Sequence, residues 1–416
     1  MIDVLYDEIG KPNGLLNKTY FGVFYNLKES LGVNHTTIDL VQDRCVYPIE
    51  PLGGIRNILY ENNFIEHLND DIKKLIKKNI CHVLISSPSE GNLKYGDIEN
   101  LLQNIDNANL PQKQFTFAQG NYNLKKQFND FEHDLNLIIM EHKLDTSKES
   151  FYYIHKGWWK KSDNPPTINY RKDINDDIRP YRYISYNKSL RPDRVALLSL
   201  LLKEDLLKYG LISMGSENAG SAGTYQPWPT KFDFVSDKKL KNDVIKWSKK
   251  LEKLRPMKIE GDVDVEKIDV GENSNLNPCG YTFAKQYRKV YFQIVTEDVF
   301  EADSMFFSQT TYRPLVQNLP FLMFGTNDMM NNLKEIQGFK TFDFMIDENY
   351  DSINNNDKRL LAVVEEVKRL CHMDIDKLHQ LFISNLDKLE YNHEKMIDGV
   401  YNSDERNFKN YLLSLC

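Results

Sequence analysis

Short apolar runs alternate with amphipathic helical patterns along this chain, and this alternation constrains the fold more than any other feature. Residues 64–80 (FIEHLNDDIKKLIKKNI) gather their apolar side chains on one stripe of a helix, and the apolar run 83–85 (VLI) follows directly. Residues 181–214 show the same order, with a strand, a long helix over 191–210 and a second strand. A helix between two strands carries the chain back across a sheet, so such strands pair in parallel. The sequence therefore predicts an α/β fold.

The length of 416 residues exceeds what one hydrophobic core normally supports, so two domains are expected. Residues 143–180 are polar, aromatic and interrupted by prolines, with no sustained period, which is typical of a connection between domains. Further strands are expected over 289–298, 320–325 and 339–346. We predict four segments, namely an N-terminal α/β domain over 1–150, an irregular connection over 151–180, a second α/β domain over 181–350 and a helical tail over 351–416 that packs back on the domains.

Charge and cysteine usage narrow the class of protein. The formal net charge is −7 and no long basic run occurs, which argues against a broad face for nucleic acid phosphates but is compatible with a local basic cleft. The five cysteines are scattered and follow no metal-binding spacing, so reduced thiols are expected. The first residues resemble no signal peptide, and no window of 18 residues is apolar throughout. These features predict a soluble cytoplasmic protein with no membrane partner.

The turn NKSLRPDR, residues 187–194, is a candidate anion site. Arg191 and Arg194 flank the predicted start of a helix, where backbone N–H groups and the helix dipole favour negative charge. An arginine fork in that place suits a diphosphate. The alternative is that both arginines are solvated first-turn residues with no ligand.

A second candidate segment is FFSQTTYRPLVQNLPFLMFGT, residues 306–326. Ser308 is the expected N-cap of a helix, which leaves Gln309 and Thr310 in the first turn, near any bound phosphate or ribose. Gly325 ends the following strand and lets a ligand or backbone approach closely. A capped helix without any ligand explains the same residues when this segment is taken alone.

These segments together resemble a known family. In order and spacing, residues 183–215, KVYFQIVTED, residues 306–326 and GFKTFDFMIDENYD are similar to the donor-binding half of two-domain nucleotide-sugar glycosyltransferases of the α-1,3-fucosyltransferase type. The chain also resembles glycosyltransferase-like proteins of large bacteriophages, whose D-E-S-Y-D motif is matched by residues 347–351. The resemblance covers about residues 180–352, and the N-terminal half shares only CHVLISSPSEGN and FTFAQGNYN in outline with the phage group.

The resemblance implies a GT-B fold, in which two Rossmann-like domains face each other and the C-terminal one binds the sugar donor. Arg194 matches the arginine expected at the donor diphosphate, with Arg191 and Lys188 beside it. The glutamate that holds the ribose in the family falls on Gln309, and the lysine near the diphosphate falls on Thr310. The implied donor site comprises Lys188, Arg191, Arg194, Ser308, Gln309, Thr310, Arg313 and Gly325.

An inverting glycosyl transfer also needs a base that deprotonates the acceptor hydroxyl, and the family takes it from the N-terminal domain. Glu90, in the turn SSPSEG, is our candidate, and a solvated loop glutamate is the alternative. Asn121 follows another predicted strand and is an acceptor-side candidate. Trp158 and Trp159 lie among lysines and could stack on bases or sugars, or could simply pack at the domain junction.

The sequence thus predicts a glycosyltransferase that moves a sugar from a UDP- or GDP-linked donor to an acceptor hydroxyl. The acceptor is either a modified base of viral DNA, in a host cytoplasm, or a saccharide. No metal and no further cofactor is expected, because DVDVE at 262–266 lies in a polar insert and no other DxD-like motif has strand context. The alternative is an inactive glycosyltransferase-like module that binds a glycan or belongs to a virion, which the neutral Gln309 and Thr310 favour.

Overall fold

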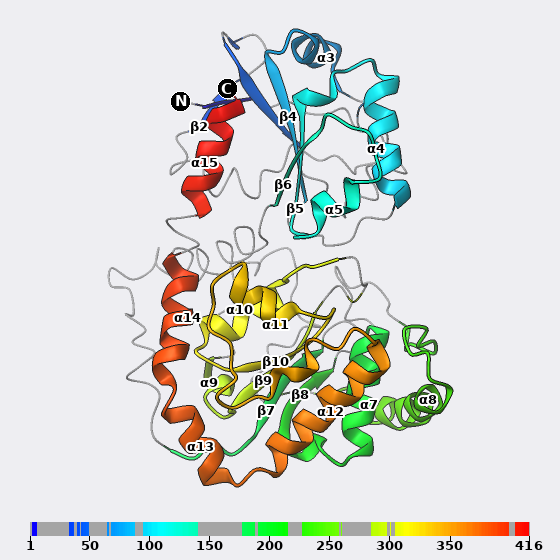
Figure 1. Ribbon diagram of the computed structural model, residues 1–416, viewed down its shortest axis with the longest axis vertical. Coiled ribbons are helices and arrows are strands. Elements are labelled where there is room, and N and C mark those ends of the chain that lie inside the picture. The colour runs from blue at the N-terminus through cyan, green and yellow to red at the C-terminus, as the bar shows by residue number, and fades with distance from the viewer. Residues whose placement is uncertain are drawn as a thin grey trace. The chain divides into compact units, whose positions relative to one another are not determined.

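The computed structural model divides the chain into two compact units. Unit 1 comprises Met1–Glu149, Glu301–Gln309 and Asp398–Cys416, and unit 2 comprises Ser150–Phe300 and Thr310–Ile397. Figure 1 shows the elements of both units. The structure describes residues 2–5, 33–36, 40–41, 43–49, 65, 68–87, 95–139, 177–187, 190–214, 227–257, 259, 284–297, 300, 304–398 and 404–415.

Unit 1 contains a six-stranded parallel sheet in the order β2-β1-β3-β4-β5-β6. Its strands are β1 (Ile2–Leu5), β2 (Val33–Thr36), β3 (Cys45–Ile49), β4 (Cys81–Ser87), β5 (Phe115–Gln119) and β6 (Asn136–Ile139). Its helices are α3 (Asp70–Lys77), α4 (Tyr95–Asn107), α5 (Leu124–Phe128) and α15 (Asp404–Leu415).

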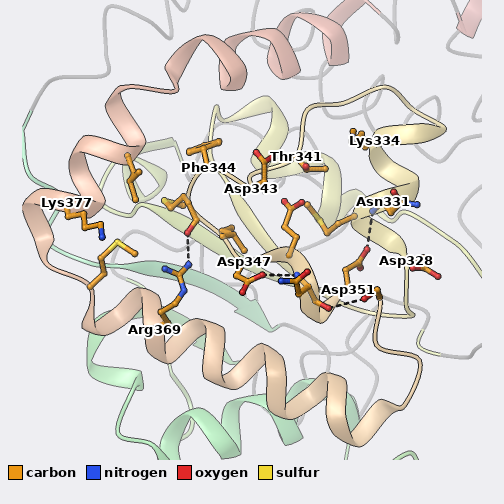
Figure 2. Close-up of a pocket in the computed structure, with 18 residues that line it drawn as sticks. Asp328, Asn331, Lys334, Thr341, Asp343, Phe344, Asp347, Asp351, Arg369 and Lys377 are labelled. Carbon is orange, nitrogen blue, oxygen red and sulfur yellow. Dashed lines mark hydrogen bonds between the residues drawn. The ribbon is translucent and has the colours of Figure 1, made fainter.

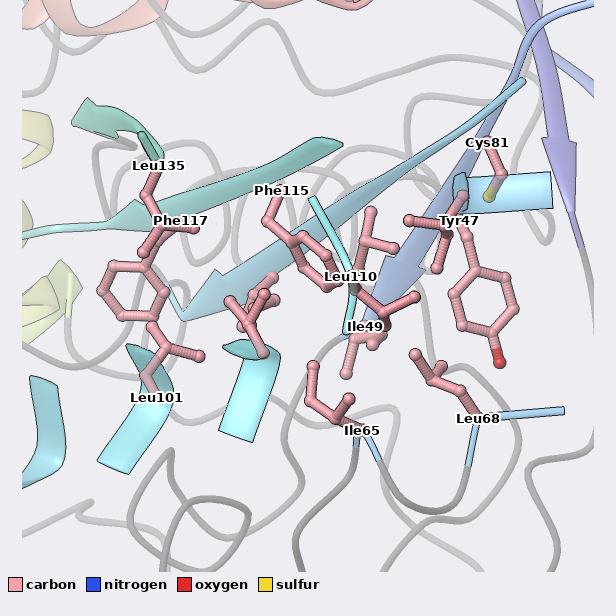
Figure 3. Packing of buried hydrophobic residues seen from close by; sticks show 14 of the residues in the cluster. Tyr47, Ile49, Ile65, Leu68, Cys81, Leu101, Leu110, Phe115, Phe117 and Leu135 are labelled. Carbon is pink, nitrogen blue, oxygen red and sulfur yellow. The ribbon is translucent and has the colours of Figure 1, made fainter. Parts of the chain in front are cut away.

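The core of unit 1 forms because its central strands are apolar on both faces, as expected for a parallel sheet covered by helices. Side chains of β3 and β5 pack against residues that precede α3 and against α4 (Figure 3). Helix α3 begins at Asp70 because the Asn69 side chain accepts a hydrogen bond from the Asp71 N–H at 2.8 Å. The predicted helix over 64–80 is therefore shorter than its apolar pattern suggested.

Unit 2 contains a four-stranded parallel sheet in the order β10-β9-β7-β8. Its strands are β7 (Tyr183–Asn187), β8 (Gly210–Met214), β9 (Phe292–Thr296) and β10 (Phe321–Phe324). Its helices are α7 (Pro192–Lys203), α8 (Lys238–Glu252), α9 (Ala284–Tyr287), α10 (Gln309–Val316), α11 (Met329–Glu335), α12 (Asn356–His372), α13 (Ile375–Ile383) and α14 (Leu386–Asp398), of which α10 begins and α14 ends with one residue counted in unit 1.

Two expectations for unit 2 are wrong in detail. The predicted strand over 339–346 is irregular, with a turn only over 343–345, and the Phe342 N–H donates to the Glu348 carboxylate at 2.6 Å instead of to a neighbouring strand. The predicted helix over 191–210 ends at Lys203, and a short 3-10 turn, Leu207–Tyr209, leads into β8. The α/β class with two parallel sheets and a run of C-terminal helices is confirmed. Among the described residues, no helix has the length and apolar character needed to span a bilayer.

Candidate functional site

The order of strands in unit 2 places a topological switch point between β7 and β9. From β7 the chain moves to β8 on one side, whereas β9 and β10 lie on the other side. In open parallel sheets, ligands bind beyond the carboxyl ends of the strands at such a point. The residues that follow β7, β9 and β10 are therefore the ones to examine for a site.

Arg191 lies at this point as the residue that precedes the first turn of α7. Its guanidinium donates to the backbone carbonyl of Glu297, directly after β9, and to the Asp193 carboxylate at 2.8 Å. Its side chain as a whole is 23% exposed, although its Nε atom is buried. Pro192 opens α7 and has no N–H, which fits a first helical position. A cation and a helix start are thus held together at the switch point.

Arg194 lies one turn further along α7 and is only 5% exposed. Its Nε donates to the Thr296 hydroxyl at 3.1 Å, and its Nη2 donates to the Thr296 carbonyl at 3.3 Å. These bonds tie α7 to the end of β9. In this structure Arg194 therefore contacts the scaffold of the site, and the prediction that it contacts a diphosphate stays a prediction.

Glu297 is the residue of this site that the sequence reasoning missed. It is fully buried after β9, its N–H donates to the Phe324 carbonyl at 3.0 Å, and its carboxylate accepts a hydrogen bond from the Thr311 hydroxyl. It thereby joins β9, β10 and α10. The only sequence signal for it was an acidic residue directly after an apolar strand, within VTED.

Gly325 packs against Glu297 in the turn after β10. A Cβ atom at this position would lie 3.1 Å from the Glu297 Cβ and 2.5 Å from the Met329 Sδ, so a side chain would displace one of them. This close packing explains why residue 325 is a glycine, as expected where a strand end approaches other atoms closely. The Gly325 carbonyl accepts from the Arg359 Nε at 3.0 Å, which fixes the turn to α12.

The remaining donor candidates are placed in different ways. Arg313 on α10 is half-buried, with its guanidinium carbon 5.7 Å from the centroid of the Tyr186 ring on β7. Thr310 is half-buried in the first turn of α10, and Ser308 is buried directly before that helix. Gln309 begins α10, but its side chain and the whole of Lys188 lie outside the described residues. The structure thus gathers Arg191, Arg194, Arg313 and Gly325 around the ends of β7, β9 and β10.

Asn121, which lies just after β5 in unit 1, binds backbone N–H groups with its side chain. Its Oδ1 accepts from the Asn123 N–H and from the Met305 N–H, both at 2.9 Å, and the residue is fully buried. The neighbouring Tyr122 N–H donates to the Met305 carbonyl at 2.8 Å. Asn121 therefore fastens residues 304–308 to the β5–α5 loop. Glu90, Trp158 and Trp159 lie outside the described residues.

Gln119 is a further polar residue at the same edge of the unit 1 sheet. It ends β5, is fully buried, and neither its Oε1 nor its Nε2 has a hydrogen-bond partner among the residues that the structure describes. A buried amide without partners costs free energy, so such groups mark positions where water or a ligand is expected.

A cavity of about 740 Å³ lies in unit 2 (Figure 2). Its walls come from α11, from the turns over 341–352 and from α12 and α13. Acidic groups outnumber basic ones in the lining. The charged lining residues are Asp328, Lys334, Asp343, Asp347, Glu348, Asp351, Arg369 and Lys377.

The motif at 347–351 forms the centre of this cavity wall and is held firmly. The Tyr350 hydroxyl accepts from the Met323 N–H of β10 at 3.0 Å. The Asp351 carboxylate accepts from the Asn331 N–H of α11 at 3.1 Å, and burial raises its pKa to about 6. Burial also raises the pKa of Glu348 to about 7, although the hydrogen bond from the Phe342 N–H acts in the opposite direction and lowers it. These residues therefore fix the turn to the sheet and give the cavity two carboxyls that titrate close to neutral pH.

Metal ligands do not cluster in the part of the chain that the structure describes, where no group of three or more histidine, cysteine or acidic side chains could hold an ion.

Comparison with known proteins gives only distant neighbours. No family model matches the sequence, and no curated protein matches it. The trehalose-6-phosphate phosphatase N-terminal domain of Candida albicans matches with a TM-score of 0.44 and 8% identity over 95% of this chain and 74% of that chain. The α,α-trehalose 6-phosphate synthase of Burkholderia multivorans matches with a TM-score of 0.40 and 9% identity over 95% and 74%. Because TM-scores of this size do not establish a shared fold, the α/β class stated above rests on the two sheets alone.

Proposed function

We propose that this protein is a glycosyltransferase that moves a sugar from a nucleoside diphosphate donor to an acceptor hydroxyl. The observation that carries this proposal is the position of Arg191, a partly exposed cation at the start of α7 and at the switch point of the unit 2 sheet. A helix start with an adjacent arginine is suited to a diphosphate, and the switch point is where parallel sheets take nucleotides.

In the proposed complex, the donor diphosphate lies against the first turn of α7 and accepts hydrogen bonds from Arg191. The Asp193 carboxylate competes for this guanidinium, so binding requires Arg191 to turn from Asp193 toward the phosphate. Arg194, Glu297 and Thr311 serve as scaffold, because their bonds hold the ends of α7, β9 and α10 in place. Gly325 keeps the end of β10 close to Glu297.

The reaction breaks the bond between the sugar anomeric carbon and the diphosphate oxygen, and it forms a bond from that carbon to the acceptor oxygen. The diphosphate leaves with the bonding electrons, and Arg191 and the α7 dipole stabilise its charge. A base accepts the proton of the acceptor hydroxyl, and Glu90 is our candidate for that role. Gln309 retains a hydrogen-bonding amide for a ribose hydroxyl, whereas Thr310 supplies no charge, so weak donor affinity is expected.

Thermal-shift titration with UDP-glucose and with GDP-mannose tests the proposal. We expect one donor to raise the Tm of the wild type, because a ligand that binds only the folded state stabilises it. Arg191→Ala should lose this shift while keeping the Tm of the free protein within a few degrees. Arg194→Ala should lower the Tm of the free protein, because it removes two buried bonds to Thr296. Arg44→Ala, at an exposed position in unit 1, is the control that keeps the shift.

The absence of any shift with either donor, or an unchanged shift in Arg191→Ala, would overturn the donor site. The acceptor is proposed to be a modified base of viral DNA or a saccharide. An inactive glycan-binding or virion-associated module is the second candidate, favoured by the neutral residues Gln309 and Thr310. A donor that binds but is neither hydrolysed nor transferred over a long incubation would select this second candidate.

A further inference from the structure

Helix α8 in unit 2 has one buried face and one face made almost entirely of lysine. Figure 1 shows α8 beside α7 at the outer side of unit 2. Its inward face consists of the buried residues Leu240, Val244, Ser248 and Leu251. The opposite face carries five exposed lysines, Lys238, Lys239, Lys246, Lys249 and Lys250, and the exposed C-cap residue Lys253 extends it to six.

The six lysines form a continuous basic stripe, named here the lysine face. At 3.6 residues per turn they fall within an arc of about 120°, and the helix is about 22 Å long. Asn242 is the one other residue within that arc. The nearest carboxylate along the helix, Asp243, lies at the border of the arc and pairs with Lys203 of α7 at 2.9 Å.

No member of the lysine face forms an ion pair with any residue that the structure describes. The Lys250 Nζ lies over the ring of Trp247, 3.7 Å from its centroid. Lysines three and four positions apart on a helix repel one another, and this arrangement includes Lys246 with Lys249 and Lys250. Asp243 is the carboxylate that faces this charge, because its pKa is lowered by its hydrogen bond with Lys203 and also by Lys239 and Lys246. A chain with a net charge of −7 thus concentrates six lysines beside one aspartate on one helix. Such a stripe attracts polyanions.

The chemistry of the stripe separates two kinds of polyanion. A helix that binds a membrane surface inserts an exposed apolar face between lipid head groups. In α8 the apolar face is buried within unit 2, so insertion is not open to it. Lysine is a flexible point charge that meets phosphates without the bidentate geometry that arginine uses to read bases. These properties fit the regularly spaced phosphates of a nucleic acid duplex.

We propose that the lysine face of α8 lies along the phosphate backbone of double-stranded DNA and binds it without regard to sequence. The proposal rests on the proposed function only in its consequence, which is that the acceptor is a group on DNA and not a saccharide. Binding itself involves no sugar donor and is measured without one.

Fluorescence anisotropy with a labelled random-sequence DNA duplex of about 30 base pairs tests the proposal. The test variant is the triple substitution Lys246→Gln, Lys249→Gln and Lys253→Gln. The matched control is Lys77→Gln, Lys78→Gln and Lys113→Gln, at three exposed positions in unit 1. Both variants make the net charge more negative by three, so any difference between them reports location and not total charge.

We expect the wild type to bind the duplex with an affinity that falls steeply with salt, because each phosphate contact releases a counterion. The test variant should bind roughly tenfold more weakly near 100 mM salt, and the slope of log affinity against log salt should shrink by about 3. The control should match the wild type. Equal binding by the test variant and the wild type would overturn the proposal.

Two further arms exclude other polyanions. Tighter binding to an RNA hairpin than to the duplex, or binding to phosphatidylserine vesicles that the test variant loses while DNA binding persists, would also overturn the assignment to DNA. Thermal shift with the two sugar donors on the test variant keeps the hypotheses apart. A retained donor shift with lost DNA binding supports both proposals, and a retained donor shift with unaltered DNA binding removes only this one.

Discussion

At the scale of single residues, the buried carboxyl groups of unit 2 have the clearest consequences. Burial raises the pKa of Glu348 from its usual value of 4.5 to about 7. The folded state therefore holds this proton more tightly than the unfolded chain, and the contribution of Glu348 to stability falls as pH rises from about 4.5 to 7. Above pH 7 the folded protein carries the full cost of a buried charge at this position.

Glu348→Gln should remove this pH dependence, because the amide still accepts from the Phe342 N–H but cannot ionise. As pH rises from about 5 to 8, the unfolding free energy of the variant should increase relative to that of the wild type, by about 3 kcal/mol at most. Urea unfolding at both values measures this. Glu335→Gln, on the exposed side of α11, is the control and should change little. A wild type and variant that respond identically to pH would contradict the raised pKa.

Thr311 donates a hydrogen bond to the carboxylate of the buried Glu297. Thr311→Val keeps the shape of the side chain but removes the hydroxyl that donates to the carboxylate. We expect a loss of about 1–3 kcal/mol of unfolding free energy, because one hydrogen bond to a fully buried carboxylate disappears. Thr311→Ser keeps the hydroxyl and should be milder in chemical denaturation. If serine cost as much as valine, the lost methyl packing and not the hydrogen bond would explain the effect.

Some residues of the candidate site could be predicted from adjacent sequence, and others could not. Arg191 was predictable because a Pro-Asp pair after it and an apolar helix beyond it are visible in adjacent sequence. Glu297 was not, because its partners at residues 311 and 324 come from other elements of the chain. The contact of Arg194 with Thr296 was missed for the same reason, whereas its contact with a diphosphate stays a prediction.

At the scale of elements, the alternation of apolar runs with helical patterns predicted the strands of unit 2 well. It failed where an apolar run had no neighbouring strand to pair with. Strands β7, β8, β9 and β10 were all expected from apolar runs bounded by turns. Residues 339–346 have the same apolar character, yet among the described strands β9 is the only one paired with β10. Instead, Phe339, Phe342 and Met345 are buried, and none of the three lies in a strand. Pairing is a long-range property that the local pattern does not contain.

The fastening of residues 304–308 to the β5–α5 loop is an element-scale contact that can be tested directly. Asn121→Ala removes the acceptor for the Met305 N–H, so this amide should exchange with solvent at least about tenfold faster in hydrogen-exchange measurements. Asn121→Asp keeps an acceptor oxygen and should preserve much of the protection. A fully protected Met305 amide in the alanine variant would show that Tyr122 and its ring contact with Phe307 hold the segment without Asn121.

At the scale of the whole molecule, the two units are not consecutive stretches of chain. Unit 1 takes its first part from the N-terminus, a short part from residues 301–309 and α15 from the C-terminus. Helix α15 contributes the buried Leu412 and a hydrogen-bonded chain, in which the Tyr411 hydroxyl meets the Thr116 Oγ1 at 2.5 Å and Thr116 meets the His82 Nε2 at 2.8 Å. Periodicity in the sequence could not show that this C-terminal helix packs on the N-terminal unit, because it indicates an apolar face but not the element against which that face packs.

This organisation predicts that residues 1–149 do not form a stable unit alone. Without α15, the buried Thr116 hydroxyl loses its hydrogen bond with Tyr411, and the apolar surface that Leu412 covers is exposed to water. We expect a fragment of 1–149 to show no cooperative urea transition by circular dichroism, whereas the full chain does. Fusing residues 398–416 to the fragment through a flexible linker should restore a transition, and Tyr411→Phe in that fusion should weaken it by about 1 kcal/mol. A fragment of 1–149 that unfolds cooperatively on its own would show that unit 1 folds stably without α15.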